Sequence, residues 1–205
     1  DTISKDRKAR SKRKEELLIE EVLLPRGGKT VWRYLDGAAA PDASWTSGRF
    51  DDSGWKSGNG PLGYGEEGLG TTLSFGDDEE NKHMTAYFRA TFSAEDGAKG
   101  KFKAVALLLR RDDGAVVYIN GREVARSNMP PKVVFSTPAS SAVGTLDEDK
   151  FHRYIIPPDL LAEEGMNTVA VEVHQASPRS SDFLFDLEIS GYAKDDKSPE
   201  PDKTP

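Results

Sequence analysis

An all-β sandwich is the fold class that the sequence predicts, and one hairpin signal is the clearest reason. The segment Leu107–Pro130 carries apolar, β-branched and aromatic residues typical of strands, among them Val116 and Tyr118. Asn120-Gly121 follows, and this dipeptide favours a type I′ turn, in which both central residues have positive φ. The segment therefore predicts two strands joined by a tight hairpin.

Alternating side chains are the second observation. The stretches 85–92 and 183–189 alternate between core-type and polar residues, which is the period of a half-buried strand. In the stretch 167–174 three valines occupy one face of a strand, while Glu172 and His174 occupy the other. Clusters of Gly, Pro, Asp and Ser separate such stretches, as turns do in all-β domains.

Residues 1–25 are predicted to be a charged helix or linker. Basic residues come first, then glutamates interleaved with apolar residues, and the first proline is Pro25. Three interpretations stay open: a solvated helix or linker, a basic arm for nucleic acid or anionic lipid, and a helix that packs on the sandwich or on a partner.

The sandwich itself is expected over residues 26–193, and 194–205 is expected to be a disordered Pro-rich linker. Its predicted strands are Val31–Leu35, Met84–Phe92, Phe102–Arg110, Ala115–Ile119, Glu123–Arg126, Phe151–Ile156, Asn167–His174 and Phe183–Ser190. Residues 157–161 form a turn or a helical turn. Residues 36–81 are expected to be a long loop, functional or packed as a lid. Linker-like ends indicate one module of a multidomain protein.

Composition narrows the classes of function. The 205 residues suit one domain, and a net charge of -7 argues against a nucleic-acid binder. The chain has no cysteine, which excludes disulfides and thiolate metal sites. It also has no run of about 18 apolar residues, so no membrane span is expected.

Several motifs, taken in order, resemble one known family. They are WRYLD at 32–36, FDDSGW at 50–55, PLGYG at 61–65, TAYFR at 85–89, YING at 118–121 and NTVAVEVH at 167–174. Together they resemble the galactose-binding-domain-like β-sandwich, a jelly roll, over roughly residues 31–191. Such domains are found in large exported bacterial proteins and as sugar-binding domains of glycoside hydrolases.

The resemblance implies a non-catalytic carbohydrate-binding or accessory module at the bacterial surface or outside the cell. Its implied partners are a glycan or polysaccharide and neighbouring domains of the same polypeptide. The alternative is a structural domain that docks on a neighbouring domain and binds no sugar. Domains with this fold have many different functions, so the residues of the site have to distinguish sugar binding from docking.

Aromatic residues of the long loop are the first candidate for sugar binding. Trp45 and Tyr64 would offer ring faces on which the C–H face of a pyranose stacks, beside polar groups. The alternative is that these rings pack the loop onto the sandwich. In families of this kind the tryptophan of FDDSxW, here Trp55, is usually structural.

A polar cluster at the end of one strand is the second candidate. Its predicted ligand-binding residues are Asp112, Asp113, Asn128, His174, Gln175, Arg179 and Asp182. Their side chains form directional hydrogen bonds, and sandwiches commonly bind through loops at one end. The alternative is a hydrogen-bonded network that only closes the sandwich.

Calcium is the one cofactor considered, as a structural ion. Ca²⁺ takes six to eight oxygen ligands, and Asp36, Asp186 and Glu188 are the predicted ligands. No D-x-D-x-D-G loop is present, and an acidic solvated surface is the alternative.

No enzyme is predicted. The three histidines, His83, His152 and His174, are far apart in sequence, and neither a nucleophile elbow nor a phosphate-binding loop is present. An enzyme that uses His174 with Asp112 or Asp182 is the remaining third hypothesis.

Overall fold

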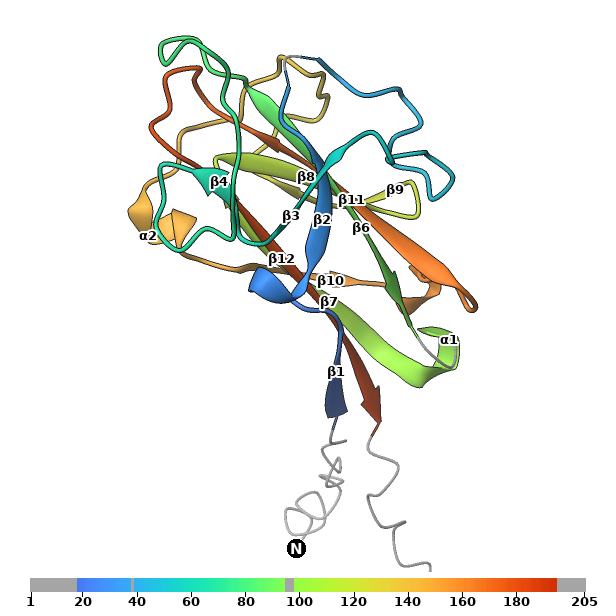
Figure 1. Cartoon of the computed structure of the whole chain (residues 1–205). Helices are drawn as coiled ribbons and strands as arrows, with labels where there is room; N and C mark the ends of the chain where they lie inside the picture. The colour runs from blue at the N-terminus through green and yellow to red at the C-terminus, as the bar shows by residue number, and fades with distance from the viewer. Residues whose placement is uncertain (1–17, 38, 95–97, 195–205) are drawn as a thin grey trace, which may run out of the picture.

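Two six-stranded sheets stack face to face in the computed structural model, which describes residues 18–37, 39–94 and 98–194 (Figure 1). The first sheet has the order β10 (His152–Ile156), β7 (Phe102–Asp112), β12 (Phe183–Lys194), β4 (Leu62–Tyr64), β5 (Thr71–Thr72), with β1 (Leu18–Leu24) also paired to β12. The second has the order β3 (Lys56–Asn59), β2 (Val31–Leu35), β6 (Thr85–Ser93), β11 (Met166–His174), β8 (Gly114–Ile119), β9 (Arg122–Ser127). The predicted all-β jelly-roll sandwich is therefore confirmed.

Helical segments are short. They are α1 (Ala98–Lys101), α2 (Thr145–Glu148) and the 3-10 turns η1 (Gly27–Lys29) and η2 (Pro158–Leu160). Within the described residues, no helix is long and apolar enough to cross a bilayer. All strand pairs run antiparallel except β4 and β5, which run parallel.

Each predicted strand is present, and no predicted end differs from the observed one by more than four residues. The β8–β9 hairpin turns at Asn120 and Gly121, whose φ values are 51° and 83°, so the predicted positive-φ turn is confirmed. The expected structureless loop over 36–81 is wrong in part, because β3, β4 and β5 lie in it. These strands are two to four residues long and rich in Gly, Ser and Thr, so they carry almost no strand signal.

The N-terminal helix prediction is wrong for the residues that the structure describes. Leu18–Leu24 form strand β1, which pairs antiparallel with β12 from Leu18 opposite Lys194 to Leu24 opposite Ile189. Helix propensities differ by less than about 1 kcal/mol per residue, and pairing with a long strand overrides them. Residues 1–17 lie outside the described part, so the basic-arm interpretation stays a prediction.

The core lies between the two sheets. On β11 the three valines are fully buried against the other sheet, which confirms the predicted inward face. Phe185 on β12 stacks on Phe88 with ring centroids 4.3 Å apart, and Trp32 meets Phe185 edge-on at 4.8 Å. The two sheets thus interlock through aromatic rings, which bury large apolar areas.

A third layer covers the outer face of the second sheet. One loop, residues 36–55, places Trp45 edge-on against Tyr87 and Tyr118, with centroids 5.0 and 5.6 Å apart. A second loop, residues 128–144, buries Met129 and Ala139 against the same face. The chain itself therefore covers the part of this face around Tyr87, Tyr118 and Val116.

Arg89 on β6 fastens the first of these loops. Its side chain is buried, its Nε donates to Asp52 at 2.7 Å, and its Nη1 donates to the carbonyl of Trp45. The guanidinium carbon also lies 5.1 Å from the Phe50 ring centroid. The Arg89 guanidinium thus makes two hydrogen bonds and one cation–π contact to the same loop.

We expect Arg89→Ala to lower the free energy of unfolding by about 2–3 kcal/mol. The substitution leaves the acceptors on Asp52 and Trp45 without their donor and removes the contacts that hold the 36–55 loop. Urea denaturation measures it. Arg33 stands opposite Arg89 on β2 but is exposed, so Arg33→Ala is the matched control and should change stability by less than about 0.5 kcal/mol. Equal effects of the two variants would contradict this role of Arg89.

Candidate functional site

An open depression of about 470 Å³ lies at one end of the sandwich. It is lined by Asp112, Asp113, Ala142, Val143, Gly144, Glu148, Ser177, Arg179, Ser180, Ser181 and Asp182. These residues come from the end of β7, the segment that leads into α2, and the β11–β12 loop, which lie at the left of Figure 1. The two segments that formed the predicted polar cluster do face the same end.

Two arginines of β7 hold α2 beside the depression. Arg110 Nε donates to the carbonyl of Glu148 at 3.0 Å, and its Nη2 pairs with Asp149 at 2.6 Å. Arg111 Nη1 pairs with Asp147 at 2.9 Å. These bonds fix the segment whose glutamate reaches the depression.

Asp112 and Asp113 have opposite roles although both are buried. Asp113 Oδ1 accepts from Val143 N at 2.8 Å, and its Oδ2 accepts from Ala176 N at 2.7 Å. Asp113 therefore connects the segment before α2 with the β11–β12 loop. Asp112 Oδ2 is buried without a hydrogen-bond partner among the described residues, which is the uncommon and costly state for a buried polar atom.

The depression is crowded with negative charge. Burial raises the pKa of Asp112 to about 9, and the charges of Asp113 and Asp182 act in the same direction. Burial also raises the pKa of Glu148, helped by Asp182 and Glu66. Acidic neighbours therefore disfavour the ionised forms of both Asp112 and Glu148.

Three acidic side chains converge at the rim. Glu66, Glu148 and Asp182 each offer a carboxylate oxygen within 4.8 Å of the others, which is the one group of this kind in the described part of the chain. Glu66 lies on the loop between β4 and β5, and Asp182 directly precedes β12. All three side chains are half-buried.

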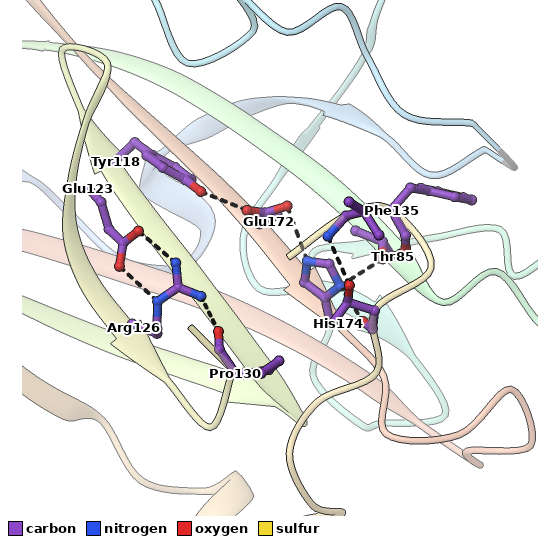
Figure 2. A network of polar contacts seen from close by, with 10 residues as sticks. Thr85, Tyr118, Glu123, Arg126, Pro130, Phe135, Glu172 and His174 are labelled. Atoms are coloured by element: carbon purple, nitrogen blue, oxygen red, sulfur yellow. Dashed lines mark hydrogen bonds and ion pairs between the residues drawn. The ribbon is translucent and has the colours of Figure 1, made fainter. Parts of the chain in front are cut away.

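His174 and Gln175 are fully buried at the end of β11, beneath the surface. His174 Nδ1 donates to the carbonyl of Thr137 at 2.8 Å, and its Nε2 lies 3.2 Å from Glu172 Oε2 (Figure 2). Tyr118 donates its hydroxyl to the other oxygen of Glu172 at 2.8 Å. This network fastens the 128–144 loop over the sheet, and the imidazole does not reach the depression.

The remaining predicted polar residues bind the protein itself or solvent. Asn128 Nδ2 donates to the carbonyls of Asp113 and Ser141 at 3.0 and 2.7 Å. Gln175 Nε2 donates to the Tyr64 hydroxyl at 3.0 Å and to the carbonyl of Asp182 at 2.5 Å. Arg179 is exposed at the rim, 3.1 Å from Glu80.

The predicted aromatic platform is packed into the protein. Trp45 and Tyr64 are 8% and 5% exposed, so neither offers a ring face to solvent in this structure. Burial raises the pKa of the Tyr64 hydroxyl to about 12, and the charges of Asp112 and Asp182 add to this. Trp55 meets Phe50 edge-on at 5.7 Å, in a packing role.

The structure does not bring the predicted calcium ligands together as a metal-binding group. Asp36 accepts from Lys56 Nζ at 2.8 Å and from the backbone of Ser74 at 2.7 Å. Asp186 accepts from the backbone N–H of Gly27, and Glu188 pairs with Arg26 at 3.5 Å. Their oxygens anchor loops and form ion pairs, and these three residues are not among those that the structure groups at metal-ligand spacing.

Glu148 is the acidic lining residue that the sequence did not indicate. Its acidic neighbourhood, 147–149, is visible in the sequence, but its position depends on the two arginines of β7. Glu66 lies two residues after Tyr64, so it is close in sequence to a predicted site residue but is not predicted itself.

No family model and no curated protein match the chain. Among solved structures, Bacteroides uniformis beta-glucuronidase 2 is similar, with a TM-score of 0.56 and 21% identity over 84% of this chain. A calcium-binding mutant of that enzyme matches with a TM-score of 0.54 and 20% identity. A glycosyl hydrolase family 2 member from Bacteroides cellulosilyticus matches with a TM-score of 0.52 and 17% identity over 85% of this chain.

This chain spans only 18% to 20% of the length of those structures. At such identities the likeness establishes the sandwich fold. The chain is therefore similar to one small part of these glycoside hydrolases.

Proposed function

We propose that the chain is a non-catalytic accessory module of a larger carbohydrate-active protein, and that it binds a glycan in the depression. The observation that carries the proposal is the depression itself, which gathers carboxylates, serine hydroxyls and Arg179 at the loop end of the sandwich. The similarity to one small part of glycoside hydrolases supports the accessory role. A surface or extracellular location belongs to the same proposal.

The charge of the depression sets the class of glycan. Carboxylates accept hydrogen bonds from sugar hydroxyls, and the serine hydroxyls both donate and accept. Crowded acids repel an anionic sugar, so a neutral, hydroxyl-rich glycan fits better than a uronic acid. In this respect the proposed ligand differs from the glucuronides named for the similar enzymes.

An enzymatic role has less support. His174 is fully buried and bound to Glu172 and Thr137, so it has no route to a substrate. Asp112 and Asp182, its predicted partners, line the depression, but none of the lining residues is a histidine. General acid–base chemistry needs its groups within hydrogen-bond reach of the substrate, and the predicted histidine–aspartate pair does not meet there.

Glycan binding is tested by an array of neutral and acidic oligosaccharides, followed by titration calorimetry of any hit. We expect Arg179→Ala to weaken binding about three- to tenfold, because it removes a donor at the rim and leaves every carboxylate in place. Arg122 is exposed at the opposite end of β8, so Arg122→Ala is the control. A folded wild-type chain without any hit would contradict the proposal.

Docking on a neighbouring domain is the second candidate. The pair β1 and β12 projects beyond the rest of the sandwich at the bottom of Figure 1. Leu18, Ile19 and Val22 of β1 are each about half exposed. An apolar edge of this kind is typical of a contact surface.

A further inference from the structure

The convergence of Glu66, Glu148 and Asp182 has the spacing of a metal-binding group. Ca²⁺ binds oxygens at about 2.3–2.6 Å, so two oxygens on one ion lie at most about 5 Å apart. The three carboxylates already lie within 4.8 Å of one another. A single ion between them would need only small side-chain movements.

A second, independent observation comes from Asp112. This residue is 2% exposed and lines the same depression, and its Oδ2 has no hydrogen-bond partner in the described part of the chain. Asp113, its neighbour, has both oxygens satisfied by backbone N–H groups. Oδ2 of Asp112 is therefore a buried oxygen without a hydrogen-bond partner, beside the three converging carboxylates.

The cations nearby are engaged elsewhere. Arg110 pairs with Asp149, Arg111 pairs with Asp147, and Arg179 at the rim pairs with Glu80. Ser181 donates to Asp182 Oδ1 at 3.2 Å, which leaves the second oxygen of Asp182 available. Unneutralised carboxylates this close repel one another, and a bound cation removes that repulsion.

We propose that the depression binds one Ca²⁺ ion, held by Glu66, Glu148 and Asp182, with Asp112 in the lining of the same depression. Hard cations prefer oxygen ligands, and Ca²⁺ accepts the irregular geometry that loop residues offer, whereas Mg²⁺ demands a near-ideal octahedron. Ca²⁺ takes six to eight oxygens, so water or a glycan hydroxyl would fill the remaining positions. The proposal stands without the proposed glycan binding.

Calorimetric titration of the full 205-residue chain with CaCl₂, after removal of metals by a chelator, tests this site. We expect one ion per chain with a dissociation constant on the order of 0.1–1 mM, as in extracellular calcium modules. We expect Asp182→Asn and Glu66→Gln each to weaken binding about tenfold or more. A rise in melting temperature with CaCl₂ should be lost in the same variants.

Glu67→Gln is the matched control, because Glu67 is the exposed neighbour of Glu66 and is not part of the group. Circular dichroism verifies that each variant is folded, and Glu66→Gln on its loop keeps the test valid if Asp182→Asn unfolds. The proposal is overturned if the wild-type chain shows neither heat nor a melting shift at 10 mM CaCl₂, roughly tenfold above the weakest dissociation constant expected. It is also overturned if Glu67→Gln lowers affinity as much as Glu66→Gln.

Discussion

Gly63→Ala is expected to lower the free energy of unfolding by about 3 kcal/mol or more. A Cβ atom at Gly63 would lie 1.9 Å from the carbonyl oxygen of Phe183 and 2.9 Å from its carbonyl carbon. These are backbone atoms of β12, so no side-chain rotation relieves the overlap. The strand β4 would have to separate from β12, which also exposes the buried Leu62 and Tyr64 on either side.

Urea denaturation followed by circular dichroism measures this loss. Gly54→Ala is the matched control, because a Cβ there meets nothing within 4 Å and the residue does not require positive φ. We expect the control to stay within about 0.5 kcal/mol of the wild type. A loss at Gly63 no larger than at Gly54 would show that β4 and β12 are not held this closely.

The role of Gly63 is a feature of the fold that could not be predicted from the sequence. The glycine-rich stretch 58–70 has no phosphate-binding pattern, and no other motif in the sequence explains its glycines. In the structure, Gly63 and Gly70 lie against the backbone of neighbouring segments. Close approach between strands is a property of the assembled sheet, and a single sequence does not encode it locally.

The longer strands were predictable for the opposite reason. The valines of β11 and the phenylalanines of β12 repeat with period two, because one face of each strand is buried against the other sheet. β1 was missed because its apolar residues occur on both faces of a projecting strand, without alternation. Its partner lies about 170 residues away in sequence, so local pattern could not reveal the pairing.

The candidate site was predictable only in part. Asp112, Asp113, Arg179 and Asp182 do line one depression, because the end of β7 and the β11–β12 loop meet there. Which of two adjacent aspartates is satisfied depends on backbone N–H groups of other loops, which no sequence pattern reports. His174 was predicted as a site residue because it is next to the β11–β12 loop in sequence. Its ring is fully buried in the protein and does not line the depression.

His174→Ala is expected to lower the free energy of unfolding by about 3–5 kcal/mol, because it removes a fully buried ring and leaves two buried acceptors unpaired. Without the imidazole, Glu172 Oε2 and the carbonyl of Thr137 lose their partner inside the protein (Figure 2). The 128–144 loop would also lose its hydrogen bond to His174, so we expect faster cleavage within this loop in limited proteolysis.

His152→Ala separates this effect from the general loss of a histidine. The His152 side chain is 25% exposed on β10, and its Nε2 lies 3.5 Å from Asp147, beyond a good hydrogen bond. We expect a loss of about 1 kcal/mol or less. In a double-mutant cycle, Glu172→Gln combined with His174→Ala should lose less than the sum of the single losses, because the orphaned carboxylate is gone. Additive losses would mean that Glu172 and His174 are not coupled, and the loop would then be held by its apolar contacts alone.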